Sequence, residues 1–225
     1  MKTLKIIKSG ITDFHHIWDV QKELFNQVVE NRSQNYLILT EHKPVITIGK
    51  SGSLNNLVTD PSYLLSKGIA VVRIDRGGDI TFHGPGQLIG YPILDLSQFR
   101  KDIHWYLRNL EEVIIQTLRE FGIQGERVPG LTGVWVNKKK ICAIGVKVTR
   151  WVTMHGFALN ISTNLDYFKH IVPCGITDRG VTSLFDQTGN IVNQKDVTKS
   201  VIYNFRDVFG IQIIHEKEEI NSGIR

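Results

Sequence analysis

Cysteine is scarce in this chain, with only Cys142 and Cys174 among its 225 residues. Two cysteines cannot form the disulfide framework on which small secreted domains depend. The opening residues, MKTLKIIKSGITDFHH, do not fit a signal peptide, because Lys5 and Lys8 interrupt any apolar stretch. The sequence therefore predicts a cytoplasmic protein with free thiols.

Long hydrophobic runs are also missing. No stretch approaches the ~18 apolar residues of a membrane span, so we expect no membrane association. Lys and Arg number 27 and Asp and Glu number 22, and the resulting net charge of +5 favours an acidic partner. The basic residues are not interleaved with aromatic ones, as single-strand binders require, and we expect no nucleic-acid partner.

The common nucleotide and metal signatures are absent. GKS at 49–51 has Pro44 where a phosphate-binding loop needs glycine, and GPGQLIG at 84–90 has Ile89 in place of the third glycine of a dinucleotide fingerprint. No G-x-S-x-G elbow occurs. Metal-ligand spacing is missing among six of the eight histidines, namely His15, His16, His83, His104, His155 and His170. We therefore expect neither a cofactor nor a metal.

The length and the apolar periodicity predict one domain over 1–225, long enough to bury roughly 70% of the surface that the unfolded chain exposes. A helical period marks 13–31, with Thr12 or Asp13 as its N-cap, and also 61–68, 102–121, 165–171 and 194–209. Strands are predicted at 36–42, 45–50, 69–75, 79–83, 88–96, 153–162 and 211–216, with a hairpin over 133–148 that turns at 137–139. Strands come in runs with helices between the runs. This order favours an α+β, or mixed α/β, fold around a largely antiparallel or mixed sheet flanked by helices.

A glycine-rich segment, RGGDITFHGPGQ at 76–87, is the first of three segments that suggest chemistry. Two glycine pairs flank a short strand here. Glycines permit a close approach of the backbone or unusual dihedral angles. Two tight turns would explain the same spacing.

The second segment is KKKICAIGVKV at 138–148. Strand alternation predicts one face with Lys140, Cys142, Ile144, Val146 and Val148. Lysine rarely points into an apolar face without a partner. The alternative is that Lys140 belongs to a solvated lysine turn.

The third segment, IVPCGI at 171–176, places Cys174 between a proline and a glycine. Such a corner can present sulfur to a substrate, with backbone N–H groups near an oxyanion. A free thiol has a pKa of about 8.5, and a neighbouring lysine would favour the thiolate. A lone cysteine is nonetheless more often a small buried hydrophobe.

Taken together, these segments resemble the octanoyltransferase family of lipoate biosynthesis, the lipoyl(octanoyl) transferases. The resemblance rests on RGGDITFHGPGQLIGYPILDL (76–96), KKICAIGVKV (139–148), HGFALNIS (155–162) and VPCGITDRGVTSL (172–184). It implies a fold similar to the catalytic domain of biotin and lipoate protein ligases. It also implies transfer of octanoyl from acyl carrier protein to a lysine of lipoyl domains, in 2-oxoacid dehydrogenases and in the glycine cleavage H protein, as the first step of endogenous lipoate synthesis.

The same resemblance implies the site residues. It places a catalytic cysteine–lysine dyad on Cys174 and Lys140, with an acyl thioester on the cysteine. Its acyl-pocket positions fall on Arg76, Gly77, Gly78, Asp79, Ile80, Thr81, Phe82, His83, Ala143, Ile144, Gly145, Gly156, Phe157 and Ala158. Phe82 replaces the tyrosine expected before the histidine, which would remove a hydroxyl from the pocket. We expect Gly77, Gly78, Gly145 and Gly156 to leave room for the acyl chain.

Three alternatives remain open at this point. Cys142 could be the nucleophile, although its place between Ile141 and Ala143 suits a buried thiol. The chain could be an ATP-dependent lipoate or biotin ligase of the same fold. It could also be a scaffold that binds lipoyl domains or carrier protein without chemistry.

Overall fold

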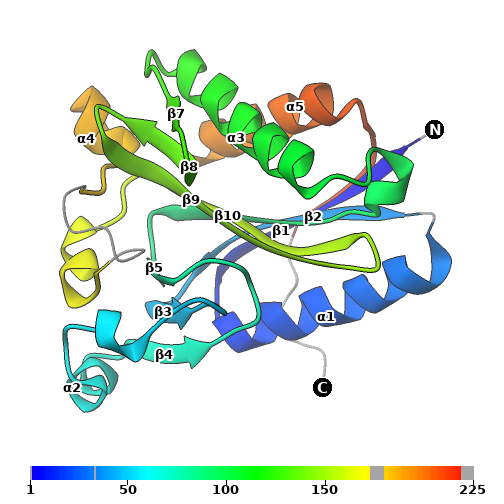
Figure 1. The fold of residues 1–225 in the computed structure, drawn as a ribbon. Helices are drawn as coiled ribbons and strands as arrows, with labels where there is room; N and C mark the ends of the chain where they lie inside the picture. The colour runs from blue at the N-terminus through cyan, green and yellow to red at the C-terminus, as the bar shows by residue number, and fades with distance from the viewer. Residues whose placement is uncertain (1, 33, 173–179, 219–225) are drawn as a thin grey trace.

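The protein is built around a large mixed β-sheet (Figure 1). The computed structural model describes residues 2–32, 34–172 and 180–218. Within these residues the sheet has the strand order β11-β1-β2-β6-β10-β9-β8-β7. β1 pairs in parallel with β2 and β11, and the other pairs are antiparallel. The strands are β1 (Thr3–Thr12), β2 (Asn35–His42), β6 (Gln87–Ile93), β7 (Glu126–Val128), β8 (Leu131–Val136), β9 (Lys139–Thr149), β10 (Val152–Asn160) and β11 (Gln212–Glu218).

A second sheet lies beside the first and has the order β4-β3-β5. Its strands are β3 (Val45–Ile48), β4 (Ala70–Arg73) and β5 (Ile80–His83). β2 and β3 are only two residues apart in the chain, yet they belong to different sheets. The bend at Lys43–Pro44 separates them, as expected from a proline that fixes its own backbone and lacks an N–H donor.

Helices cover both faces of the large sheet (Figure 1). α1 (Phe14–Asn31) lies on one face, and α3 (Ile103–Glu120) and α5 (Gln194–Phe209) lie on the other. Asp13 is the N-cap of α1, because its carboxylate accepts hydrogen bonds from the backbone N–H groups of His15 and His16. The shorter helical segments are α2 (Pro61–Ser66), α4 (Leu184–Thr188), η1 (Leu54–Asn56), η2 (Leu96–Gln98) and η3 (Leu165–His170).

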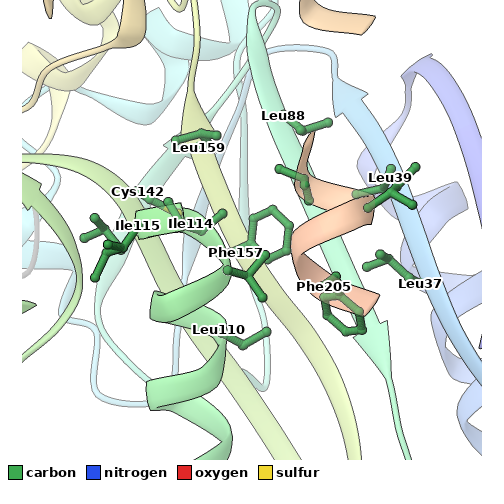
Figure 2. Close-up of a cluster of buried hydrophobic side chains, with 14 of the residues drawn as sticks. Leu37, Leu39, Leu88, Leu110, Ile114, Ile115, Cys142, Phe157, Leu159 and Phe205 are labelled. Atoms are coloured by element: carbon green, nitrogen blue, oxygen red, sulfur yellow. The ribbon is translucent and has the colours of Figure 1, made fainter. Parts of the chain in front are cut away.

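The two-residue period of the strands builds a core on each side of the sheet. Phe157 of β10 packs between the sheet and the helices α3 and α5, among Leu110, Ile114 and Phe205 (Figure 2). The next residue, Ala158, faces α1 and packs with Ile17 and Ile89. Both faces of the central strands are therefore buried, and β10 is buried along its whole length.

The fold class predicted from the sequence is confirmed, as are the long helices and the hairpin. The hairpin turns at Asn137 and Lys138, which both have positive φ angles (48° and 67°). The expected helix at 165–171 is a 3₁₀ helix, η3. None of the helices in 2–32, 34–172 and 180–218 has the length and apolar character that crossing a membrane requires.

Gly90 on β6 tests how tightly the central strands are packed. A Cβ atom there would lie 2.1 Å from the Phe157 ring, so Gly90→Ala should lower the free energy of unfolding by about 1–3 kcal/mol. Gly10→Ala on β1 is the matched control, since a Cβ there meets nothing within 4 Å. Urea unfolding of both variants measures the difference. Equal stabilities would show that Phe157 moves aside freely.

Candidate functional site

A cavity of about 330 Å³ lies between the two sheets, on the α1 side of the large one. β5 of the small sheet forms one wall, and β6, β9 and β10 of the large sheet form another. Phe14 of α1 also lines the cavity. The predicted site residues found in its lining are Arg76, Gly78, Asp79, Ile80, Thr81, His83, Lys140, Ala143, Ile144, Gly145, Gly156, Phe157 and Ala158.

Two predicted site residues of the described part of the chain do not line the cavity. Gly77 does not line the cavity, and its N–H donates to the carbonyl of Val146 over 2.8 Å. Phe82 is fully buried in the core of the small sheet, where its ring stacks on Tyr167 at 4.6 Å. The ring of a tyrosine at position 82 would therefore lie in this core and not in the cavity lining. Cys174 lies outside the described residues.

Small side chains on neighbouring strands make the cavity floor apolar. Ala158 of β10 pairs with Ala143 of β9 on one side and with Ile89 of β6 on the other. All three residues line the cavity. This register leaves a shallow apolar strip across three strands, which suits the methylene groups of a ligand.

Gly145 and Gly156 line the cavity and also make room for protein atoms. A Cβ on Gly145 would lie 2.9 Å from the carbonyl oxygen of Gly77 and 3.1 Å from the side chain of Arg76. A Cβ on Gly156 would lie 2.1 Å from the carbonyl oxygen of Gly90. These glycines therefore allow the 76–78 segment to rest on β9 and allow β10 to approach β6 closely.

Lys140 points to the cavity because the register of the hairpin shifts beside it. Cys142 pairs with Val134, but Lys140 pairs with the next residue, Trp135, so Ile141 is an extra residue on β9. Val134 and Trp135 point to opposite faces, and so do their partners. The predicted shared face of Lys140 and Cys142 is therefore wrong. Uniform alternation cannot anticipate a bulge.

Cys142 lies on the core side of the sheet, opposite the cavity (Figure 2). Its side chain is fully buried among Ile114, Ile115 and Leu159. Burial raises the pKa of the Cys142 thiol well above its usual range, although the nearby Lys140 cation acts in the opposite direction. A thiol that is both buried and protonated is a poor nucleophile, so Cys142 is a structural residue.

The backbone of Lys140 is fastened to the segment that follows residue 179. Lys140 N–H donates to the carbonyl of Gly180 (2.9 Å), Thr182 N–H donates to the carbonyl of Lys140 (3.0 Å), and Lys140 and Val181 form a parallel bridge. The Lys140 ammonium lies 4.7 Å from the centre of the Trp135 ring. The chain is thus held beside Lys140 a few residues after Cys174.

A buried chain of hydrogen bonds joins the glycine-rich segment to Lys140. Arg76 donates to Thr47 Oγ1 (3.0 Å), and Thr47 Oγ1 lies 3.3 Å from His83 Nε2. His83 Nδ1 lies 2.9 Å from Gln87 Oε1. Gln87 donates to Asn160 (2.8 Å), whose amide donates to the carbonyl of Thr182 (2.9 Å). Every donor can point in one direction along this chain if His83 is neutral, with its proton on Nδ1.

Two histidines behind the cavity are held in the neutral form. Burial lowers the pKa of His83 to about 3 and the pKa of His42 to about 4. His42 Nε2 lies 2.7 Å from the hydroxyl of Tyr91, whose own pKa burial raises well above its usual range. The two histidines therefore add no charge to the positive charges of Arg76 and Lys140.

A second polar group lies at the His155 side of the cavity. His155 Nε2 is 2.8 Å from Asp75 Oδ1, and Lys147 Nζ is 2.6 Å from Asp75 Oδ2. The hydrogen bond from His155 is the largest cause that lowers the pKa of Asp75, and Lys147 contributes to the same shift. Burial lowers the pKa of His155. Among the described residues no group of three His, Cys, Asp or Glu side chains is arranged to hold a metal ion.

Several residues of this site were not predicted from the sequence, including Thr47, His42, Gln87, Tyr91 and Asn160. Gln87 and Asn160 lie within the segments that carry the family resemblance, at the ends of GPGQ and HGFALN. Both are polar residues in strands that are otherwise buried, and this polarity is the feature that could have identified them. Thr47 and His42 lie in strands whose position beside the cavity depends on tertiary pairing.

The two neutral histidines predict how stability varies with pH. Their unfolded pKa of 6.5 exceeds the folded values of about 4 and about 3, so between these limits the unfolded chain binds protons that the folded protein excludes. The free energy of unfolding should therefore fall as pH drops below about 6.5, by up to about 1.4 kcal/mol per pH unit for each histidine.

Urea unfolding between pH 4.5 and pH 7.5 measures this slope. His42→Gln should be less stable at pH 7.5 but show a shallower slope. His104→Gln, on the exposed start of α3, is the control and should keep the slope of the unchanged protein. A His42→Gln slope as steep as that of the control would contradict the assignment of a neutral His42.

Comparison with known proteins agrees with this geometry. Residues 13–206 match the family model of the lipoyl protein ligase A/B catalytic domain. The chain is 46% identical over 230 residues to an octanoyltransferase of Flavobacterium psychrophilum, covering 95% of this chain and 99% of that protein. It is 49% identical over 216 residues to an octanoyltransferase of Clostridium kluyveri, covering 93% and 92% respectively.

Solved structures with the same fold include a putative lipoate protein ligase from T. acidophilum, with a TM-score of 0.74 at 17% identity over 98% of this chain and 90% of that one. A biotin protein ligase from Aquifex aeolicus gives a TM-score of 0.53 at 14% identity over 93% and 71%. At these identities the likeness concerns the fold alone. Together with the close relatives, it shows that the chain belongs to the octanoyltransferase family, within the lipoyl protein ligase A/B catalytic-domain fold.

Proposed function

We propose that the protein moves an octanoyl group from octanoyl-acyl carrier protein to a lysine of lipoyl domains, the first step of endogenous lipoate synthesis. The relatives at 46% and 49% identity are octanoyltransferases, and the fold is that of lipoate protein ligases. The acceptors are the lipoyl domains of 2-oxoacid dehydrogenases and the glycine cleavage H protein. The reaction belongs to the cytoplasm, where carrier protein and acceptors meet.

One observation supports this proposal most directly: Lys140 is turned toward an apolar cavity. The register shift beside Trp135 directs the side chain there, and Ala143, Ala158 and Ile89 provide the apolar floor. Burying an alkyl chain on such a floor stabilises the complex by roughly 0.8 kcal/mol per CH₂. An ammonium beside an apolar slot suits an acyl thioester, whose tail is apolar and whose reacting end develops negative charge.

In the first half-reaction the Cys174 thiolate attacks the carbonyl carbon of the octanoyl thioester. A new C–S bond forms to Cys174, and the bond to the pantetheine sulfur of the carrier breaks. Lys140 stabilises the attacking thiolate and then gives its proton to the departing sulfur. One thioester replaces another, so the step is close to neutral in free energy.

In the second half-reaction the acceptor lysine amine attacks the octanoyl-Cys174 thioester. Lys140, now neutral, takes the proton from the attacking nitrogen, and the Cys174 thiolate leaves. The product is an amide, which is more stable than a thioester, so this half drives the transfer. The net charge of +5 favours approach of an acidic carrier protein.

The covalent intermediate provides the first test. Mixing the protein with octanoyl-acyl carrier protein and no acceptor should add the mass of one octanoyl group, measured by intact-protein mass spectrometry. Cys174→Ser should gain no such mass under matched conditions, because its hydroxyl is not ionised near neutral pH. Cys142→Ala is the control and should gain it normally.

An adduct on Cys174→Ser would show that another group is the nucleophile. Dependence of the transfer on free octanoic acid and ATP would identify a ligase, and binding of carrier protein without any acyl transfer would identify a scaffold. Each of these results would overturn the proposal.

The second test concerns the role of Lys140. Removing a neighbouring cation raises the pKa of a thiol by about one unit or more, so Lys140→Ala should slow alkylation of Cys174 by iodoacetamide at pH 7 about tenfold. The rate should recover at higher pH, where the thiol ionises without help. Lys139→Ala, at an exposed neighbouring position, is the matched control. Unchanged alkylation in Lys140→Ala would remove Lys140 from the mechanism.

A further inference from the structure

Trp135 lies directly beneath Lys140 and is one of the largest fully buried side chains of the protein. The two residues pair across the β8–β9 hairpin, and the Lys140 ammonium lies 4.7 Å from the centre of the indole ring. A cation at this distance is attracted to the negative face of the ring, most strongly for tryptophan. The contact joins an ionic group of the cavity to a rigid group of the core.

Three features of the hairpin combine to produce this contact. The register shift between Val134 and Trp135 makes Lys140 the partner of Trp135. Gly133 has a φ of +125°, and a Cβ there would lie 2.7 Å from the carbonyl oxygen of Cys142 and 3.6 Å from Cε of Lys140. Glycine thus lets the hairpin close tightly beside the lysine stem.

A buried carboxylate holds this part of β8 in place. Glu111 of α3 accepts a hydrogen bond from the N–H of Gly133 (3.1 Å), and Arg108 and Arg127 both pair with the same carboxylate at 2.7 and 3.1 Å. The side of the hairpin that carries Trp135 is therefore fastened to α3. An aromatic ring on such a support can fix a flexible lysine side chain at low entropic cost.

We propose that Trp135 is a positioning residue for Lys140: its ring holds the ammonium in the cavity wall. The inference deepens the proposed function and rests on it for its catalytic meaning, since Lys140 acts there as the proton donor. The contact itself can be tested without the reaction.

NMR of methylated lysines tests the contact. Reductive methylation with ¹³C-formaldehyde labels lysine amines and retains their charge, and the signal missing from Lys140→Arg identifies Lys140. We expect this signal to be displaced by the ring current of Trp135. It should move toward the position of ordinary lysines in Trp135→Leu.

Lys22 provides an internal reference, because its ammonium lies 4.1 Å from the Trp18 ring on the surface. Its signal should move in Trp18→Leu and stay in place in Trp135→Leu. A Lys140 signal at the ordinary lysine position in the unchanged protein would overturn the proposal, and this result does not depend on whether a Trp135 variant folds.

The rate of octanoyl transfer tests the consequence. At pH 7 Trp135→Leu should lose about tenfold in rate and Trp135→Phe less than about threefold, because phenylalanine retains a ring face. A purely structural role for Trp135 predicts equal losses for variants of equal stability, and that result would also overturn the proposal.

The two proposals fail in different ways. If Cys174→Ser still gains octanoyl, the proposed mechanism fails, while a ring-shifted Lys140 signal keeps the positioning contact. If the acyl-enzyme forms as expected but the Lys140 signal is the same with and without Trp135, only the positioning role fails.

Discussion

The orientation of Lys140 depends on a single irregularity in strand pairing. Side chains alternate strictly along a strand, so one extra residue exchanges the faces of everything beyond it. In the β8–β9 hairpin that extra residue is Ile141, and it places Lys140 on the cavity side and Cys142 on the core side. Without the bulge, the ammonium would point into a packed core, where an ionised group is strongly disfavoured.

Close backbone contacts give the cavity its second wall. The 76–78 segment rests on β9 through the hydrogen bond from Gly77 to Val146 and through the space left by Gly145. The same segment brings Arg76 to Thr47, where the hydrogen-bond chain toward Lys140 starts. Segments far apart in the sequence thus form one connected wall of the cavity.

The electrostatics of the site follow from this packing. Burial keeps His83 and His42 neutral, so that His83 can accept from Thr47 and donate to Gln87 in the same chain. The positive charges at the cavity are those of Arg76 and Lys140, beside a floor of Ala143, Ala158 and Ile89. The lining therefore combines an apolar floor with two cationic groups and the carboxylate of Asp79.

The long helices, the 137–138 turn and the fold class could be predicted from the sequence, because periodicity and turn chemistry are local properties of the chain. The segments 76–96, 139–148, 155–162 and 172–184 also indicated the family, and most of the site residues predicted from them line the cavity. The partition of β2 and β3 into different sheets, the bulge at Ile141, and the joining of Thr47, Gln87 and Asn160 into one chain were decided by tertiary structure alone. A residue pattern states which side chains share a face, but pairing partners and their register are set by contacts between distant segments, which local periodicity does not encode.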